Sequence, residues 1–140
     1  GRADKIDFST LGYASQSWIA GANDITLNGP GSGQSGMSTK KLTSLSFTLT
    51  RVSTIEVIFM GYSYIYSGSG TIGIYVCIDD DTNNLHEISS CRYHQYGGIC
   101  PISNVSSGSH TLDIYLGASE SAVAKIQAFD TMSVKCQTVG

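Results

Sequence analysis

The main shortage in this sequence is of charge, because Asp, Glu, Lys and Arg make up only 14% of its 140 residues. That is about half the usual share in a soluble domain, so the polar surface must come from Ser, Thr, Asn, Gln and Gly. The composition is typical of secreted, viral and adhesive β proteins. Lys40–Lys41 is the one adjacent pair of basic residues. Since nucleic-acid binding needs a clustered basic face, we predict no nucleic-acid partner.

Long apolar runs and helical patterns are also missing. No run approaches the roughly 20 residues that span a bilayer, so we predict no membrane insertion. Apolar residues do not recur at the helical spacing of about 3.6 residues. The chain begins at Gly1 rather than Met and shows no signal-peptide pattern, so we expect a processed product or an excised fragment.

Motifs for catalysis are a third absence. Neither the Gly-x-Ser-x-Gly elbow nor His-Glu-x-x-His occurs, and these would indicate acyl-transfer or zinc chemistry. Cys91 and His94 are three residues apart, a spacing that keeps them from meeting in a strand or loop. Glu56 and Glu87 could serve glycoside cleavage only if the fold paired them. We therefore predict that the chain is not an enzyme.

Runs of alternating or continuous apolar residues are what the sequence has in plenty. Leu42–Thr50 places Leu45, Phe47 and Leu49 on one face, and Thr54–Tyr66 is apolar on both faces. Such runs are typical of strands, and a strand that is apolar on both faces is usually covered on both. We predict an all-β fold of about eight to ten strands, a two-sheet antiparallel sandwich of the jelly-roll type.

No linker divides the chain, so we treat residues 1–140 as a single domain. Residues 1–41 are an irregular segment with short strands, which is part of the domain or leads into it. Residues 42–140 form the sandwich head. Gly97-Gly98 is expected to be a turn between two strands.

Four cysteines are present, at positions 77, 91, 100 and 136. The spacing of Cys91 and Cys100 fits the two ends of a hairpin or loop, so we favour a disulfide between them. Cys77 and Cys136 lie in strand-like runs. They either bridge each other or act as small buried apolar residues.

The second half of the chain has a recognisable pattern. A Gly-Ser-His-Thr-Leu-Asp-Ile strand (Gly108–Ile114) is followed by a closing Met-Ser-Val strand (Met132–Val134). This resembles the jelly-roll heads at the C-termini of phage tail fibres and collagen-like proteins, and it is similar to tumour-necrosis-factor-like and complement-type globular heads. The resemblance covers about residues 42–137. The same Gly-x-His-Thr-Leu pattern also occurs in jelly-roll carbohydrate-binding modules. The resemblance implies a homotrimer on an extracellular or virion surface that recognises a cell-surface receptor or glycan.

Aromatic residues supply two candidate binding sites. Tyr62 and Tyr64 share the second face of the central strand, and Tyr75 and Tyr115 can join them from neighbouring strands. This surface is either a subunit interface or ligand platform, or it is covered by residues 1–41. The second candidate is the predicted loop Arg92, Tyr93, His94, Gln95 and Tyr96, where aromatic rings and hydrogen-bonding groups suit a sugar. An ordinary surface hairpin is the alternative.

An acidic loop offers hard oxygen ligands at alternating positions, namely Asp79, Asp81 and Asn83. Calcium takes such ligands, and a solvated acidic turn is the other interpretation. We predict no other cofactor.

Together these features predict a non-catalytic binding domain that recognises a cell-surface glycan or protein receptor as a trimeric tail-fibre- or adhesin-type head. Two alternatives stay open. One is a carbohydrate-binding module of a larger secreted enzyme, and the other is a structural or signalling jelly roll that binds protein.

Overall fold

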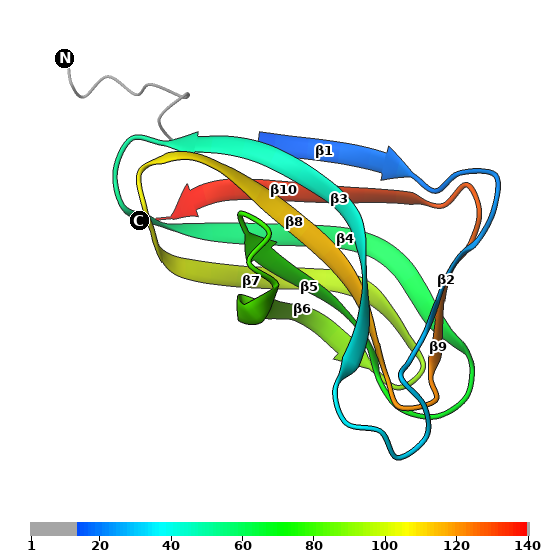
Figure 1. Cartoon of the computed structure of the whole chain (residues 1–140). Helices are drawn as coiled ribbons and strands as arrows, with labels where there is room; N and C mark the ends of the chain where they lie inside the picture. The colour runs from blue at the N-terminus through cyan, green and yellow to red at the C-terminus, as the bar shows by residue number, and fades with distance from the viewer. Residues whose placement is uncertain (1–13, 140) are drawn as a thin grey trace.

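The computed structural model describes residues 14–139, and part of the segment 1–41 therefore lies outside the described residues. Ten strands dominate this range (Figure 1). They are β1 (Ala14–Ile19), β2 (Ile25–Asn28), β3 (Met37–Leu49), β4 (Ser53–Ser67), β5 (Ile72–Ile78), β6 (His86–Cys91), β7 (His94–Val105), β8 (Gly108–Ser119), β9 (Val123–Ile126) and β10 (Thr131–Val139). One 3₁₀ turn, η2 (Thr82–Asn84), interrupts them. Among the described residues there is no helix with the length and apolar character to cross a membrane.

The strands form two antiparallel sheets. The first sheet has the order β1-β10-β4-β7, and the short strands β9 and β2 continue it from the far end of β4. The second sheet has the order β3-β8-β5-β6. The partners β1·β10, β3·β8, β4·β7 and β5·β6 together make one long hairpin whose successive pairs alternate between the sheets. This rolled hairpin is the jelly-roll arrangement, so the predicted fold class is confirmed.

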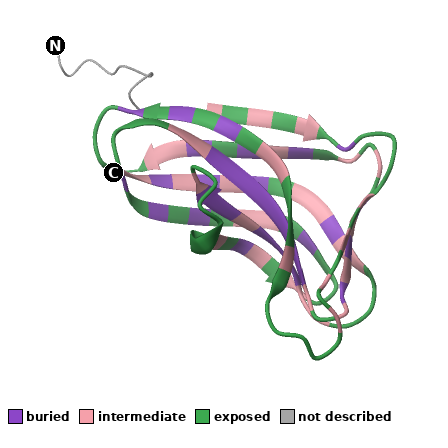
Figure 2. Ribbon diagram, in the orientation of Figure 1, coloured by how far each residue is buried: buried purple, intermediate pink, exposed green. Residues whose placement is uncertain are grey.

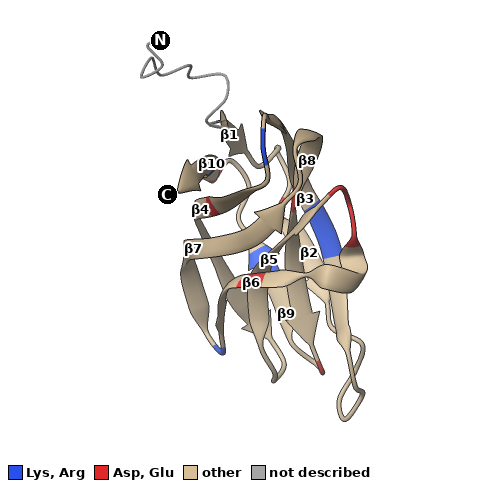
Figure 3. Cartoon of the chain, turned by 90° about the vertical axis from the view of Figure 1, so that its left-hand side faces the viewer, with Lys and Arg blue, Asp and Glu red and all other residues tan. Residues whose placement is uncertain are grey.

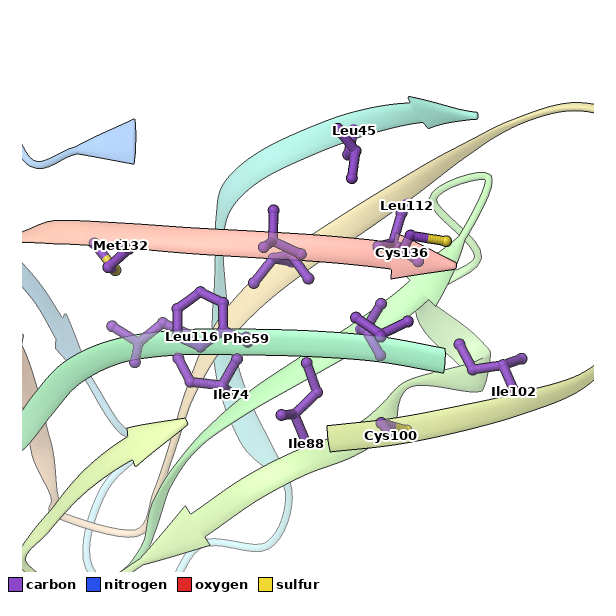
Figure 4. Close-up of a cluster of buried hydrophobic side chains, with 14 of the residues drawn as sticks. Leu45, Phe59, Ile74, Ile88, Cys100, Ile102, Leu112, Leu116, Met132 and Cys136 are labelled. Atoms are coloured by element: carbon purple, nitrogen blue, oxygen red, sulfur yellow. The ribbon is translucent and has the colours of Figure 1, made fainter. Parts of the chain in front are cut away.

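The core lies between the sheets and follows the period of two expected of strands. Buried and exposed residues alternate along the C-terminal half of β3, with Leu45, Phe47 and Leu49 inside as predicted (Figure 2). Side chains from both sheets meet in this layer, and Phe59 of β4 and Leu116 of β8 are among them (Figure 4). Burial of apolar area at about 25 cal/mol per Å² is the main stabilising term for such a layer.

The expected turn at Gly97-Gly98 is wrong, because both glycines lie inside β7. Gly97 has φ 117°, and a Cβ on it would come within 2.0 Å of the Phe59 carbonyl oxygen. Glycine is needed there because the β4 backbone approaches so closely. The turn lies earlier, at Arg92 and Tyr93.

The expected disulfide between Cys91 and Cys100 is also wrong, since all four cysteines are free thiols, and of the two alternatives for Cys77 and Cys136 the structure shows buried, unbridged side chains. Cys91 ends β6 beside the hairpin tip, whereas Cys100 lies well along β7. A strand advances by about 3.3 Å per residue, which carries Cys100 away from that tip. Cys136 faces the core of the first sheet, and Cys77 pairs with Asp113 in the second sheet. The two thiols therefore lie in different sheets.

Candidate ligand-binding face

Four aromatic rings gather on the outer face of the first sheet, where β4 and β7 pair. Tyr62 and Tyr64 come from β4, and His94 and Tyr96 come from β7. The centroid of the Tyr62 ring lies 5.2 Å from that of Tyr96, 5.7 Å from that of Tyr64 and 6.1 Å from that of His94. These are the separations of mutually attractive aromatic pairs. The cluster, which we call the aromatic face, joins residues from both sites predicted from the sequence.

An irregularity in the β4–β7 ladder forms the aromatic face. Met60 pairs with Gly97 and Ser63 with Gln95, so β4 advances by three residues where β7 advances by two. A bulge of this kind redirects the side chains beside it. Tyr62 and Tyr96 consequently lie on one side of the sheet with their rings in contact.

A shallow depression lies beside the rings. It has a volume of about 390 Å³ and is lined by Met60, Gly61, Tyr62, Tyr96, Thr131 and Ser133. Tyr96 is 66% exposed and Met60 is 64% exposed, so both side chains are open to a ligand. Strand β7 contains no Lys, Arg, Asp or Glu, and β4 contains only Glu56 (Figure 3). The four rings therefore offer apolar faces and hydroxyl groups, and Lys125 of β9 is the cross-strand neighbour of Tyr64.

The predicted loop 92–96 is divided by the structure. Arg92 and Tyr93 form the exposed tip between β6 and β7, and His94 and Tyr96 lie on the aromatic face. Gln95 is the exception, because it points into the sandwich, is 3% exposed and donates a hydrogen bond of 2.9 Å to the Ser63 hydroxyl. The expectation that Gln95 faces a ligand is therefore wrong.

The predicted platform of four tyrosines is also divided. Tyr75 and Tyr115 pair with each other on β5 and β8 of the second sheet, away from Tyr62 and Tyr64. Tyr115 is buried, and its hydroxyl donates to the Asp80 carboxylate. Burial and this hydrogen bond raise the pKa of Tyr115 to about 12. The alternative from the sequence was that residues 1–41 cover the tyrosine surface. Within the described residues, β1 and β2 of this segment extend the first sheet at its margins, since β1 pairs with β10 and β2 with β9.

Two of the three side chains expected to bind calcium, Asp79 and Asp81, have other partners. Asp79 accepts hydrogen bonds from the His110 ring and the Thr111 amide, at 2.7 and 2.9 Å. Asp81 accepts a bond of 2.7 Å from the Asn84 side chain. Asn83 lies in η2 and is exposed.

A different group, Cys77, Asp80 and Asp113, does bring its ligand atoms within 4.8 Å of one another. Here the positive charge comes from Lys41, whose Nζ lies 3.1 Å from Asp80 and 3.6 Å from Asp113. Asp113 is 1% exposed and accepts further bonds from the Ser44 hydroxyl and the Asp80 amide. Burial, reinforced by Asp113, raises the pKa of Cys77 to about 11. Lys41 and Asp80 are exposed and only Asp113 is buried, so this cluster is a surface ion pair anchored on a buried carboxylate, and it links the turn after β5 to the second sheet.

Sequence reasoning missed the contact between Asp79 and His110, which are 31 residues apart. Asp79, His110 and Ser106 follow one another in the order of a catalytic triad, carboxylate, imidazole and hydroxyl. The Ser106 Oγ lies 3.4 Å from His110 Nε2. However, Nε2 lies closer to the Ser106 carbonyl oxygen, at 2.8 Å, so it donates there. A general base must accept a proton from the nucleophile, and His110 is not placed to do so. No local motif could have indicated this contact.

Neither a family model nor a curated protein matches the chain. Solved structures show a distant likeness in fold. An Eiger TNF from S. frugiperda is 6% identical over 92% of this chain and 94% of its own, with a TM-score of 0.41. The VP2 protein of infectious bursal disease virus is 10% identical over 90% of this chain and 36% of its own, with a TM-score of 0.44.

A mannanase with a CBM35 domain from Podospora anserina is 11% identical over 85% of this chain and 28% of its own, with a TM-score of 0.32. The chain thus spans about a third of VP2 and of the mannanase. Values this low define no family, and the jelly-roll class rests on the strand pairing described above.

Proposed function

We propose that this chain is a non-catalytic binding head that recognises a cell-surface glycan through its aromatic face, on an extracellular or virion surface. The observation that carries the proposal is the cluster of Tyr62, Tyr64, His94 and Tyr96, open to solvent beside the hydroxyls of Thr131 and Ser133. Ligand sites combine apolar and aromatic lining with a few polar groups that fix orientation. Aromatic rings cover the C–H faces of a sugar, and hydroxyls bond to its edges.

The packing of the rings supports binding over catalysis. Each ring of the aromatic face touches another, on paired strands, so little side-chain freedom is lost when a ligand binds. The His110 nitrogens both face acceptors, and burial raises the pKa values of the Cys77, Cys100 and Cys136 thiols. These groups are therefore poorly suited to act as a base or a nucleophile.

The test is a glycan array followed by affinity electrophoresis with Tyr62→Ala and Tyr96→Ala. We expect each variant to lose at least about tenfold in affinity, or roughly 1.4 kcal/mol. Tyr93→Ala is the matched control, because Tyr93 is an exposed tyrosine at the hairpin tip, outside the ring contacts. Unchanged glycan binding by Tyr62→Ala and Tyr96→Ala, or an array without any bound glycan, would show that the proposal is wrong.

A second candidate is that the same surface is buried in a homotrimer, as the resemblance to tumour-necrosis-factor-like heads implies. The observation in its favour is that Met60 and Ile99 are both exposed on β4 and β7. Exposed apolar patches mark interfaces. Light scattering on the wild type and on Met60→Glu decides between the two candidates. A trimer that Met60→Glu dissociates favours the interface, and a monomer leaves the aromatic face free for a glycan or a protein receptor.

A further inference from the structure

Phe129 has a backbone conformation that its residue type rarely adopts. It lies on the corner between β9 and β10 with φ 66°, in the left-handed region, and its side chain is 68% exposed. A bulky residue with positive φ is an outlier, and glycine would adopt the same conformation without steric cost. Because the ring is mostly exposed, burial does little to offset the strain. Strain of this kind is a reason to look for a function.

The corner is fixed by its neighbours. The Phe129 amide donates to the carbonyl oxygens of Ala20 and Gly21, each at 3.1 Å, and the Ala20 amide donates to the Asp130 carbonyl at 2.9 Å. The Asp24 carboxylate accepts a bond of 2.9 Å from the Ala128 amide. The backbone around Phe129 is therefore held in place from two sides, and the ring is presented from a constrained segment.

This corner adjoins the aromatic face. Thr131, two residues after Phe129, begins β10 and lines the depression together with Tyr62 and Tyr96. The β9–β10 corner lies next to the β1–β2 bend in Figure 1, in agreement with the bonds to Ala20 and Gly21. The lining of the depression thus ends at Thr131, two residues along the chain from the exposed Phe129 side chain.

The charged residues near the corner favour an uncharged sugar over an acidic one. The residues that line the depression carry no formal charge. At the corner, Asp24 and Asp130 bring negative charge, and Lys125 Nζ lies 3.5 Å from the Asp24 carboxylate and 3.6 Å from the centroid of the Tyr66 ring. Lys125 is already engaged by Asp24 and Tyr66, so an acidic sugar at the corner would be repelled by the two carboxylates.

We propose that Phe129 is an additional contact of the same ligand site and that the ligand is an uncharged oligosaccharide, which runs from the Tyr62 and Tyr96 rings past Thr131 to the corner. This inference rests on the proposed function, because it adds a second aromatic contact and a ligand class to the aromatic face. It implies that affinity grows with chain length until the sugar reaches Phe129.

The experiment is titration calorimetry of the wild type and Phe129→Gly with neutral gluco-, manno- and galacto-oligosaccharides, from disaccharide to hexasaccharide. We expect the wild type to bind the longest member of one series at least about tenfold more tightly than its disaccharide. Phe129→Gly should lose that gain, keep the disaccharide affinity and show no fall in melting temperature, since glycine relieves the strain.

Phe129→Ala is the companion variant, because it removes the ring but keeps a Cβ at positive φ. It should lose the same gain in affinity without any rise in melting temperature. An unchanged length dependence in Phe129→Gly would overturn the contact. Preference for polygalacturonate over every neutral series would overturn the ligand class while leaving glycan binding intact. If the wild type binds none of these sugars, the inference fails, whereas the proposed function fails only if the glycan array is blank as well.

Discussion

At the scale of single residues, His110 has an unusual set of partners. Its Nδ1 lies 2.7 Å from Asp79 Oδ2, and its Nε2 lies 2.8 Å from the Ser106 carbonyl oxygen. Only the imidazolium form can donate from both nitrogens. The hydrogen bond to Asp79 accordingly raises the pKa of His110 against the effect of burial. Burial disfavours the Asp79 carboxylate, but hydrogen bonds from His110 and the Thr111 amide outweigh it and lower the pKa of Asp79.

These shifts predict a pH window for stability, which the variant His110→Gln tests. A raised histidine pKa adds stability that is complete below the unfolded value of about 6.5 and is lost as pH rises through the folded pKa. A lowered aspartate pKa adds stability above about 3.9 that is lost as pH falls through the folded pKa. We expect the gap in melting temperature between wild type and His110→Gln to be widest between about pH 4 and 6.5. A gap that does not vary with pH would contradict this.

At the scale of elements, the bulge between β4 and β7 shapes the aromatic face. Replacing Gly97 by Ala would place a Cβ 2.0 Å from the Phe59 carbonyl oxygen in a backbone with φ 117°. We expect Gly97→Ala to lower the free energy of unfolding by about 2 kcal/mol or more and to weaken glycan binding, because β4 and β7 must separate. Urea denaturation and affinity electrophoresis measure the two effects.

Gly108→Ala is the matched control for that substitution. Gly108 has φ 113°, but a Cβ there would meet no heavy atom within 4 Å. The Gly108→Ala variant therefore measures the effect of backbone strain alone. We expect this strain to lower the free energy of unfolding by about 1 kcal/mol. Equal losses in the two variants would show that the close approach of β7 to β4 is unimportant.

The elements also show how far the sequence could predict the structure. Alternation along Leu42–Thr50 predicted the buried face of β3, because a strand turns successive side chains to opposite sides. Gly97-Gly98 misled the prediction, since glycine marks a turn and a close backbone approach equally well. Telling them apart requires knowing that β4 lies alongside. The run Thr54–Tyr66 was expected to be covered on both faces, yet Met60 of this run is 64% exposed.

The sequence predicted which residues belong to the candidate site, but not that they lie together on one face. Tyr62, Tyr64, His94 and Tyr96 were all singled out from the sequence, in two separate sites that the β4–β7 pairing unites. Tyr75 and Tyr115 were grouped with them because strand periodicity gives the face of a residue relative to its own strand only. The order of strands, which places these tyrosines in the second sheet, depends on long-range pairing that no local pattern encodes.

At the scale of the whole molecule, the rolled hairpin joins segments from opposite ends of the chain without a covalent link. Strand β1 pairs with β10, and β3 pairs with β8. Four free thiols accompany this topology, so the two-sheet core must supply the stability that disulfides often supply in small extracellular domains. Cys100 and Cys136 belong to that core, on either side of Val57 in adjacent strands.

Because all four cysteines are free thiols, we expect the stability of the protein not to depend on a reductant. We expect the same urea midpoint with and without dithiothreitol, and four reactive thiols once the chain is unfolded. In the folded state, burial protects three of them and raises their pKa values, to about 11 for Cys77 and Cys136 and also above its ordinary value for Cys100. Since the thiolate is the reactive form, a thiol-specific reagent followed by mass spectrometry should modify half-buried Cys91 first. A midpoint that falls in dithiothreitol, or fewer than four thiols after unfolding, would mean that a disulfide contributes to the fold.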